Sequence, residues 1–266
     1  MRRIKALSLQ RRTPHVNTPH VSIITLLTDF GTVDSYVAEM KGVLLARAPS
    51  VALVDITHQV APGDIRAAQY LLGRTWQHFP EGTVHLAIVD PGVGTARRAL
   101  AAEHDGHRFV APDNGLLSFL PQDGHFVSLP VPTTAAATFH GRDVFAPAAA
   151  RLAIGTPLGE LGESMADPCY TPLPAPRHDH LTVIGEVIYV DRFGTLVSNI
   201  PGDAVQEGAR VRVEGSEAGS LRRTFRDVAR GALVAFVGSG GTVEIAVRDG
   251  SAARMLGVGV GAEVRA

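Results

Sequence analysis

Polar motifs follow the apolar runs of this sequence at the points where the buried strands of an α/β sheet would end. In an open α/β sheet, ligands bind at the carboxyl ends of the strands. A carboxylate at such a position needs a polar partner, so we expect these side chains to converge on one binding site. Four motifs follow strands: Thr28-Asp29-Phe30-Gly31, Asp55-Ile56-Thr57-His58, Asp90-Pro91-Gly92-Val93-Gly94-Thr95 with Arg97-Arg98 just beyond, and Pro112-Asp113-Asn114-Gly115. A fifth, Phe139-His140-Gly141-Arg142-Asp143, precedes a predicted helix.

Several of these motifs also have a purely structural interpretation. Asp29 is suited to a turn or to a helix N-cap, and Pro-Asp-Asn-Gly at residues 112–115 is a good tight turn. The glycine-rich segment 91–95 resembles a phosphate-binding loop. It lacks the Lys-Ser/Thr ending and the following helix, so nucleoside triphosphate binding there is disfavoured.

Other catalytic chemistries have weaker support in the sequence. His58 lies close to Asp55 and is a candidate metal ligand, which His85 and His140 could supplement. No His-x-x-x-His or equivalent spacing supports a metal site. The chain has no Gly-x-Ser-x-Gly element, which argues against a serine hydrolase. Its single cysteine, Cys169, falls in a proline-rich stretch and is a poor candidate nucleophile.

The first part of the chain has the pattern of an α/β domain. Apolar runs with β-branched residues predict strands at 21–27, 51–56 and 83–89, with further strands at 99–103 and 108–111. Apolar residues at helical spacing predict helices at 35–48 and 64–78, and a third helix at 142–154. This alternation predicts a mostly parallel sheet with flanking helices over residues 21–167.

The hydrophobic pattern of the sequence changes after a proline-rich linker. Residues 168–176 contain four prolines, and we assign 168–180 as an extended linker. Short β-type runs at 183–190, 195–199, 209–213, 232–237 and 243–247 are separated by Gly, Asp and Ser. Residues 181–266 are therefore predicted to form a small all-β domain, a barrel or a sandwich.

Composition narrows the class of protein further. The 266 residues include 45 % hydrophobic and 19 % charged residues, which is typical of a globular protein. A net charge of -1 disfavours a nucleic-acid-coating surface and bulk attraction to anionic membranes. Residues 1–20 are basic and polar without an apolar signal region, so we expect a flexible leader. One cysteine excludes an intrachain disulfide and fits a reducing compartment, so we expect a cytoplasmic protein.

The motifs taken together resemble those of the S-adenosyl-L-methionine (SAM) hydroxide adenosyltransferases, the adenosine-forming SAM hydrolases related to fluorinase and chlorinase. The resemblance covers residues 22–265, and its specificity comes from the order of the motifs along the whole chain. The segments that carry it are Thr28 to Gly31 with Asp34, Tyr36 and Lys41-Gly42, Asp55 to His58, Val89 to Thr95 with Arg97-Arg98, Pro112 to Gly115, Phe139 to Asp143, and Asp191-Arg192-Phe193-Gly194-Thr195 through Asn199.

This resemblance implies an enzyme in which water or hydroxide attacks ribose C5′ of SAM and releases methionine and adenosine. It also implies an N-terminal α/β domain, a C-terminal barrel-like domain, and a homotrimer with each ligand between domains of two subunits. Methionine leaves as a neutral sulfide, so no metal ion and no redox cofactor are expected. Nucleic acid and membranes are not expected partners.

The resemblance also assigns roles to individual residues. The family's catalytic aspartate, arginine and histidine correspond to Asp90, Arg97 and His140. Asp29 matches the carboxylate that holds the ribose hydroxyls, and Asp191 matches the residue that takes the methionine ammonium. Phe225 and Ser239 match positions that line the adenine and methionine ends of the ligand. Asn199 is a further candidate, in the same segment as Asp191.

The nucleophile predicted by the resemblance is water. The halogenases carry a tyrosine near the position of Asp90, and tyrosine-serine in place of His140-Gly141, and both features are absent here. The segment Gly238-Ser239-Gly240 lacks the arginine of the fluorinase segment, a departure at the methionine end. A non-catalytic SAM or adenosine sensor and, with less support, a metal-dependent hydrolase using Asp55 and His58 are the alternatives.

Overall fold

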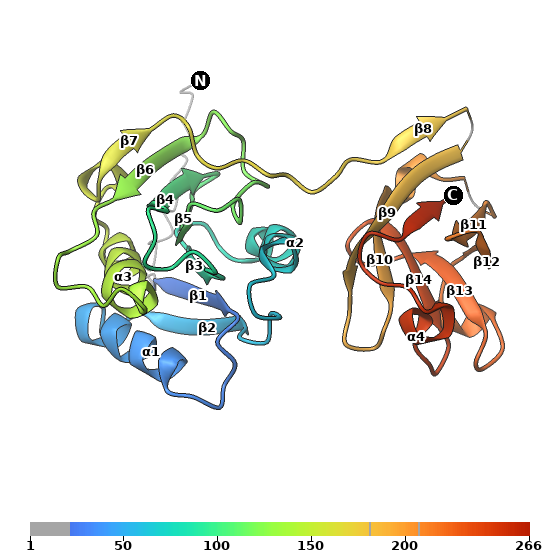
Figure 1. Cartoon of the computed structure of the whole chain (residues 1–266), viewed down its shortest axis with the longest axis horizontal. Helices are drawn as coiled ribbons and strands as arrows, with labels where there is room; N and C mark the ends of the chain where they lie inside the picture. The colour runs from blue at the N-terminus through green and yellow to red at the C-terminus, as the bar shows by residue number, and fades with distance from the viewer. Residues whose placement is uncertain (1–21, 181, 207) are drawn as a thin grey trace, which may run out of the picture.

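The computed structural model describes residues 22–180, 182–206 and 208–266, and it contains an α/β domain and a β-barrel domain (Figure 1). The predicted leader at 1–20 lies outside the described residues. An extended segment connects the two domains, between strand β7 (Glu163–Met165) and strand β8 (Arg177–Asp179). In the described part of the chain, no helix is both long enough and apolar enough to cross a membrane.

The N-terminal sheet has the strand order β2-β1-β3-β5-β4-β6-β7 over the described residues. Its first half is parallel, with β1 paired to β2 and β3, and β3 paired to β5. Its second half is antiparallel, through the pairs β4–β5, β4–β6 and β6–β7. The remaining strands of this sheet are β1 (Ile23–Thr28), β2 (Ala52–Thr57), β3 (Val84–Ile88), β4 (Ala99–His104), β5 (His107–Pro112) and β6 (His125–Leu129).

The prediction of a mostly parallel sheet is therefore only partly correct. Strands β4 and β5 form a hairpin whose turn residues, Asp105 and Gly106, both have positive φ, at 45° and 73°. Asp-Gly is a strong signal for such a two-residue turn, and a turn this short forces the strands to run antiparallel. The short strands β6 and β7 extend the same antiparallel half, and no apolar run long enough to reveal them is present in the sequence.

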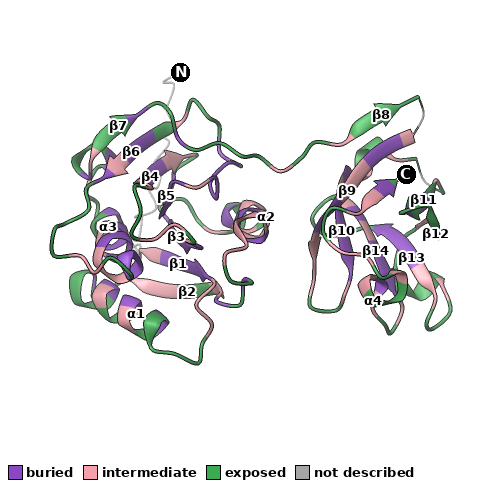
Figure 2. Cartoon of the chain, viewed as in Figure 1, coloured by how far each residue is buried: buried purple, intermediate pink, exposed green. Residues whose placement is uncertain are grey.

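Helices cover both faces of the N-terminal sheet. Helix α1 (Tyr36–Arg47) and helix α3 (Ala146–Ala153) pack into one buried apolar cluster with β1, β3 and β4. Helix α2 (Ile65–Thr75) packs into a second cluster on the opposite face, where Leu72 and Trp76 are buried. Figure 2 shows the buried strands between these helices. Asp64 caps α2 by accepting a hydrogen bond from Ala67 N at 2.9 Å. Short helical turns are η1 (Trp76–His78), the π-turn η2 (Gly141–Phe145) and η3 (Leu158–Glu160).

The C-terminal domain is a barrel, which settles the choice between barrel and sandwich. Its described strands follow the order β10-β14-β13-β12-β11-β15-β9-β8, and pairing of β10 with β9 closes seven of them into a ring. The interior is apolar and contains buried Val187, Leu196 and Ile245. The other elements are β9 (Thr182–Val190), β10 (Leu196–Pro201), η4 (Gly202–Ala204), β11 (Arg210–Val213), β12 (Ser216–Arg222), η5 (Phe225–Asp227), β13 (Leu233–Val237), β14 (Thr242–Val247), α4 (Ala252–Leu256) and β15 (Glu263–Arg265).

Parallel pairing of β1 and β3 brings two of the sequence motifs to one edge of the sheet. Thr28 at the end of β1 pairs in register with Ile88 at the end of β3. Asp29 follows β1 directly and Asp90 follows β3 after Val89, so the loops that carry them leave the sheet at the same edge. This is the carboxyl edge at which α/β domains bind ligands.

Candidate active site

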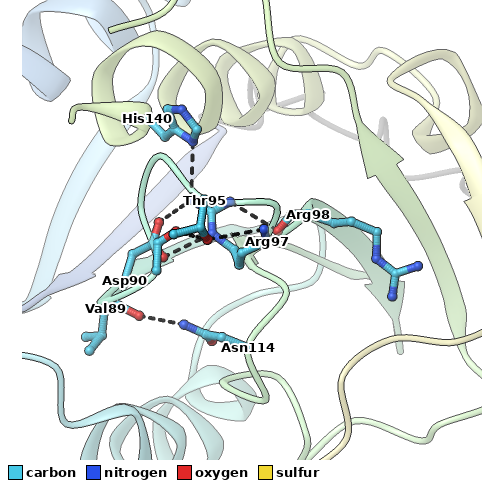
Figure 3. A network of polar contacts seen from close by, with 8 residues as sticks. Val89, Asp90, Thr95, Arg97, Arg98, Asn114 and His140 are labelled. Carbon is cyan, nitrogen blue, oxygen red and sulfur yellow. Dashed lines mark hydrogen bonds and ion pairs between the residues drawn. The ribbon is translucent and has the colours of Figure 1, made fainter. Parts of the chain in front are cut away.

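Asp90, Arg97 and His140 form one connected polar cluster, drawn in Figure 3. Arg97 donates a hydrogen bond from Nε to Asp90 Oδ1 at 3.0 Å and a second, charge-assisted one from Nη2 to Oδ2. Arg97 Nη2 also lies 3.2 Å from His140 Nδ1. The guanidinium therefore bridges the carboxylate and the imidazole, and its fork matches the carboxylate in a bidentate pair. The structure thus brings together three residues predicted as a group.

The cluster is nearly closed off from solvent. The side chains of Arg97 and Asp90 are only 8 % and 5 % exposed, and His140 is buried. Burial lowers the pKa of His140, and the neighbouring Arg97 charge lowers it further, although Asp90 and Asp143 act in the opposite direction. A neutral imidazole follows at neutral pH. Its Nδ1 faces an arginine N–H and accepts from it, which assigns the proton to Nε2.

Close approach of two loops makes this cluster possible. Gly94, in the loop between β3 and β4, has φ of 76°, and a Cβ placed there would lie 2.6 Å from the carbonyl oxygen of Ala137. Only glycine combines that conformation with that contact. The Asp90–Arg97 loop can therefore lie directly against the loop that leads into His140.

The chain that carries His140 is fixed by a second set of ion pairs. Arg142 pairs with Asp143 and with Glu39 on α1, at 2.7 and 3.0 Å. Asp143 in turn accepts a hydrogen bond from Ala136 N at 2.8 Å. The Arg142 guanidinium also lies 5.0 Å from the centre of the Phe139 ring. These contacts join the π-turn η2 to helix α1 and set the direction in which His140 projects.

The Pro112–Gly115 motif supports the site without contacting the Asp90 side chain. Asn114 Nδ2 donates to the carbonyl of Val89, the residue before Asp90, at 2.9 Å (Figure 3). Asp113 is buried and accepts from Arg98 Nε at 2.8 Å and from Cys169 N at 2.7 Å. The turn interpretation of this motif is therefore the one that its contacts support. No motif spacing predicts its link to Asp90.

Asp29 lies beside the cluster on the neighbouring strand end. Its Oδ2 accepts a hydrogen bond from Gly63 N at 2.8 Å, and the residue is half-buried. The ring of Phe30, the next residue, packs edge to face with the rings of Tyr36 and Phe139, and the three centroids lie 5.3 to 6.1 Å apart. Tyr36 is 47 % exposed, so this aromatic group is open on one side.

The four predicted site residues of the barrel domain lie elsewhere. In the described part of the chain, none of them contacts Asp90, Arg97 or His140. Asp191 Oδ1 accepts from the backbone N–H groups of Phe193 and Thr195, at 2.9 and 2.8 Å, and so closes its own turn. Phe193, which the sequence analysis left unassigned, is 72 % exposed at the tip of this turn. An aromatic residue in an Asp-x-Phe-Gly turn is the signal that could have identified it.

The other three have contacts within the chain. Asn199 Oδ1 accepts from Glu186 N at 2.8 Å, and its Nδ2 donates to the carbonyl of Pro174 at 2.7 Å. Both ends of the Asn199 amide are thus used structurally. Ser239 Oγ accepts from Arg74 Nη2 on α2 at 3.0 Å. Phe225 is 44 % exposed and packs against Phe236, with ring centroids 4.6 Å apart.

The candidate metal ligands are paired with other groups. Asp55 accepts from Lys41 Nζ at 2.7 Å, and His58 Nδ1 lies 2.8 Å from Thr28 Oγ1. Among the described residues, no three His, Cys, Asp or Glu side chains are grouped so that they could hold a metal ion. The arrangement of donors therefore gives the metal-dependent alternative no support.

Comparison with known proteins matches both domains to one family. The family model of the SAM hydroxide adenosyltransferase N-terminal domain matches residues 24–162, and that of the C-terminal domain matches residues 185–265. The chain is 43 % identical to a protein of Thermus thermophilus named (R)-S-adenosyl-L-methionine hydrolase, covering 91 % of this chain and 98 % of the relative. A protein of the same name from Salinispora tropica is 41 % identical, over 91 % of this chain and 96 % of the relative.

More distant relatives and solved structures agree with this assignment. A protein of Nocardia brasiliensis named fluorinase is 30 % identical, over 91 % of this chain and 96 % of the relative. The crystal structure of an uncharacterized conserved protein from Thermotoga maritima is 37 % identical, with a TM-score of 0.85 over 91 % of this chain and 98 % of that one. The chain belongs to the SAM hydroxide adenosyltransferase family.

Proposed function

We propose that this protein hydrolyses S-adenosyl-L-methionine to adenosine and L-methionine. The observation that carries the proposal is the buried cluster of Asp90, Arg97 and His140, in a chain whose relatives at 41 and 43 % identity are named (R)-S-adenosyl-L-methionine hydrolases. Their names specify the R configuration at sulfur, so we propose the R epimer as the preferred substrate.

The chemistry requires little beyond a well-placed water. The water oxygen forms a bond to ribose C5′ as the C5′–S bond breaks, and the bonding electron pair passes to sulfur. Methionine then leaves as a neutral sulfide, so no general acid is needed at the leaving group. Holding the water in line with the C5′–S bond contributes up to about 7–11 kcal/mol in well-oriented systems.

The three clustered residues are suited to that task. Arg97 holds the Asp90 carboxylate in place through its bidentate contact. Asp90 retains lone pairs for the water, and His140 is neutral with Nε2–H as a donor. The proton lost by the water passes to the cluster as a whole, because such closely coupled groups titrate as a unit.

Substrate binding follows from the charges that the remaining residues offer. In this proposal Asp29 accepts the ribose hydroxyls and Asp191 pairs with the methionine ammonium. Phe225 and Ser239 line the adenine and methionine ends, and the exposed ring of Phe193 is an additional stacking surface for adenine. We exclude Asn199 from the contact residues, since both ends of its amide serve the fold.

The assembly proposed is a homotrimer with the site between subunits. Among the described residues the barrel candidates do not contact the Asp90 cluster, which supports a site that a barrel from a second subunit completes. Measurement of the molar mass in solution by light scattering tests this, and a stable monomer with full activity would contradict it. We place the protein in the cytoplasm, which fits an exposed free Cys169.

The test of the function uses the R and S epimers of SAM separately, in oxygen-18 water. Adenosine carrying one heavy oxygen, with methionine alongside, is expected from the R epimer, and mass spectrometry detects it. Asp90→Asn and His140→Ala are expected to bind substrate and lose most turnover. Treatment with EDTA is expected to change nothing, since no step requires a metal. Retained ligand without adenosine would favour the sensor function instead.

A further inference from the structure

A second chain of polar side chains runs behind the candidate site, through strands β1 and β2. Thr28 Oγ1 lies 2.8 Å from His58 Nδ1, and His58 Nε2 lies 3.1 Å from Asp55 Oδ1. Lys41 Nζ on helix α1 completes the chain at 2.7 Å from Asp55 Oδ2. Thr28 is fully buried and His58 is 4 % exposed, so the inner half of this chain is dry.

Hydroxyl, imidazole and carboxylate in series have the composition of a nucleophile with its base. The surroundings of Thr28 exclude that role. Its hydroxyl has no access to solvent, and it already accepts a hydrogen bond from Phe30 N at 3.2 Å. A nucleophile needs a free path to its substrate. This series of side chains must therefore act through the backbone that Thr28 and His58 hold in place.

What they hold is the loop of Asp29. Thr28 Oγ1 fixes the backbone N–H of Phe30, and the carbonyl of His58 accepts from Gly31 N at 2.7 Å. These two contacts hold the backbone of the turn Asp29-Phe30-Gly31, while Gly63 N holds the Asp29 carboxylate itself. Gly31 has φ of 69°, a conformation that favours glycine at this turn.

The direction of each hydrogen bond follows from the groups involved. Phe30 N–H donates to Thr28 Oγ1, and the Thr28 hydroxyl then donates to His58 Nδ1. Because His58 Nδ1 accepts from Thr28, the His58 proton lies on Nε2, which is 3.1 Å from Asp55 Oδ1. Burial would raise the pKa of Asp55, but Lys41 and His58 outweigh that effect and lower it. Asp55 thus stays ionised and fixes the orientation of the His58 ring.

We propose that His58 is a positioning residue for ribose recognition, which sets the Asp29 loop through Thr28 and its own backbone carbonyl. This inference rests on the proposed function, in which Asp29 accepts the ribose hydroxyls. Substituting His58 should then weaken binding only of ligands that carry those hydroxyls. A residue with a merely structural role would weaken all ligands alike.

The experiment compares adenosine with 2′,3′-dideoxyadenosine, with calorimetric affinities measured for the full chain. The wild type is expected to prefer adenosine. In His58→Leu this preference should fall about tenfold, the usual effect of losing one buried hydrogen bond, with affinity for the dideoxy compound unchanged. Thr28→Val should reproduce the loss. His58→Asn, which keeps an acceptor at the Nδ1 position, should restore most of the preference.

A matched control lies on the same strand. Thr25 Oγ1 and His85 Nδ1 form another buried pair at 2.8 Å, three residues before Thr28 and away from the Asp29 loop. His85→Leu should leave the preference for adenosine unchanged. An unchanged preference in His58→Leu, including the case in which both ligands bind equally less tightly, would overturn the proposal. A wild type that binds the two compounds equally well would also overturn it. Because these affinities need no turnover, absence of labelled adenosine in the hydrolysis assay would refute the proposed function separately.

Discussion

Removing the positive charge of Arg97 tests whether this residue alone compensates the buried charge of Asp90. Both side chains are nearly buried, at 8 % and 5 % exposure, and the guanidinium makes two hydrogen bonds to the carboxylate. It also donates to the carbonyl of Arg98 at 3.1 Å and lies 5.3 Å from the Phe145 ring centre. Arg97→Met leaves Asp90 as an uncompensated buried charge, so we expect a loss of about 3–5 kcal/mol in the free energy of unfolding.

Neutralising both partners separates stability from catalysis. The double variant Asp90→Asn/Arg97→Met buries no net charge, and its unfolding free energy should return to within about 2 kcal/mol of the wild type. The coupling free energy of the cycle should then be at least about 1–3 kcal/mol, which is the part of the Arg97→Met loss that the double variant recovers, as expected for residues in direct contact. Turnover should stay low in both single variants and in the double variant, because neither partner alone orients the water.

Urea unfolding followed by circular dichroism measures the cycle, at one fixed protein concentration because assembly contributes to apparent stability. Adenosine release measured on the same samples gives the activity. A loss below about 1 kcal/mol in Arg97→Met would refute the view that this pair is desolvated, since exposed pairs contribute that little. Recovered activity in the double variant would refute the catalytic assignment.

Three further predictions concern other residues of the N-terminal domain. Gly94→Ala should abolish activity in a folded protein, because its Cβ would lie 2.6 Å from the Ala137 carbonyl oxygen. Gly92→Ala, where the contacts of an added Cβ are 3.5 Å or longer, is the matched control. Equal activity of the two variants would contradict the loop contact. The acid limb of the kcat/KM profile should fall below pH 6.5, because the pKa of His140 is lowered; a limb above that value would exclude neutral His140 as the titrating group. Burial lowers the pKa of His85 to about 3, so between pH 6.5 and 3 the unfolded chain binds a proton that the native state does not. The free energy of unfolding should therefore fall by about 1.4 kcal/mol per pH unit as the pH drops through this range. Urea midpoints across this range measure that slope, which His85→Leu should flatten.

The predictable part of the fold is the part whose burial leaves a simple pattern. Strands β1 and β3 are covered on both faces and appear as continuous apolar runs. Helix α2 has one buried side, with a capping Asp64 before it. Strand direction in the other half depends on the Asp105-Gly106 turn, a local signal outside the apolar periodicity that predicts strands. Closure of the barrel depends on β9 pairing with β10, and no periodicity along one strand encodes such a partner.

The candidate site also has a part that the sequence predicts and a part that it does not. Residue types at strand ends identify Asp90 and Asp29, because the carboxyl edge of a parallel sheet is where polar groups gather. The contact between Arg97 and His140 joins positions 43 apart in the chain, and it exists because Gly94 admits the Ala137 backbone. That contact is a property of two packed loops, which spacing alone does not specify.

The Pro112–Gly115 turn shows why a choice between structural and functional motifs can mislead. Its Asn114 holds the backbone before Asp90, and its Asp113 holds both Arg98 and the backbone of Cys169 in the interdomain segment. Arg98 extends this anchor to Asp167, at 2.8 Å. One tight turn thus fixes the loop that begins at Asp90 and the start of the linker to the same point. A turn with these contacts is structural in its chemistry, and it supports the function by coupling the position of the linker to the geometry of the site.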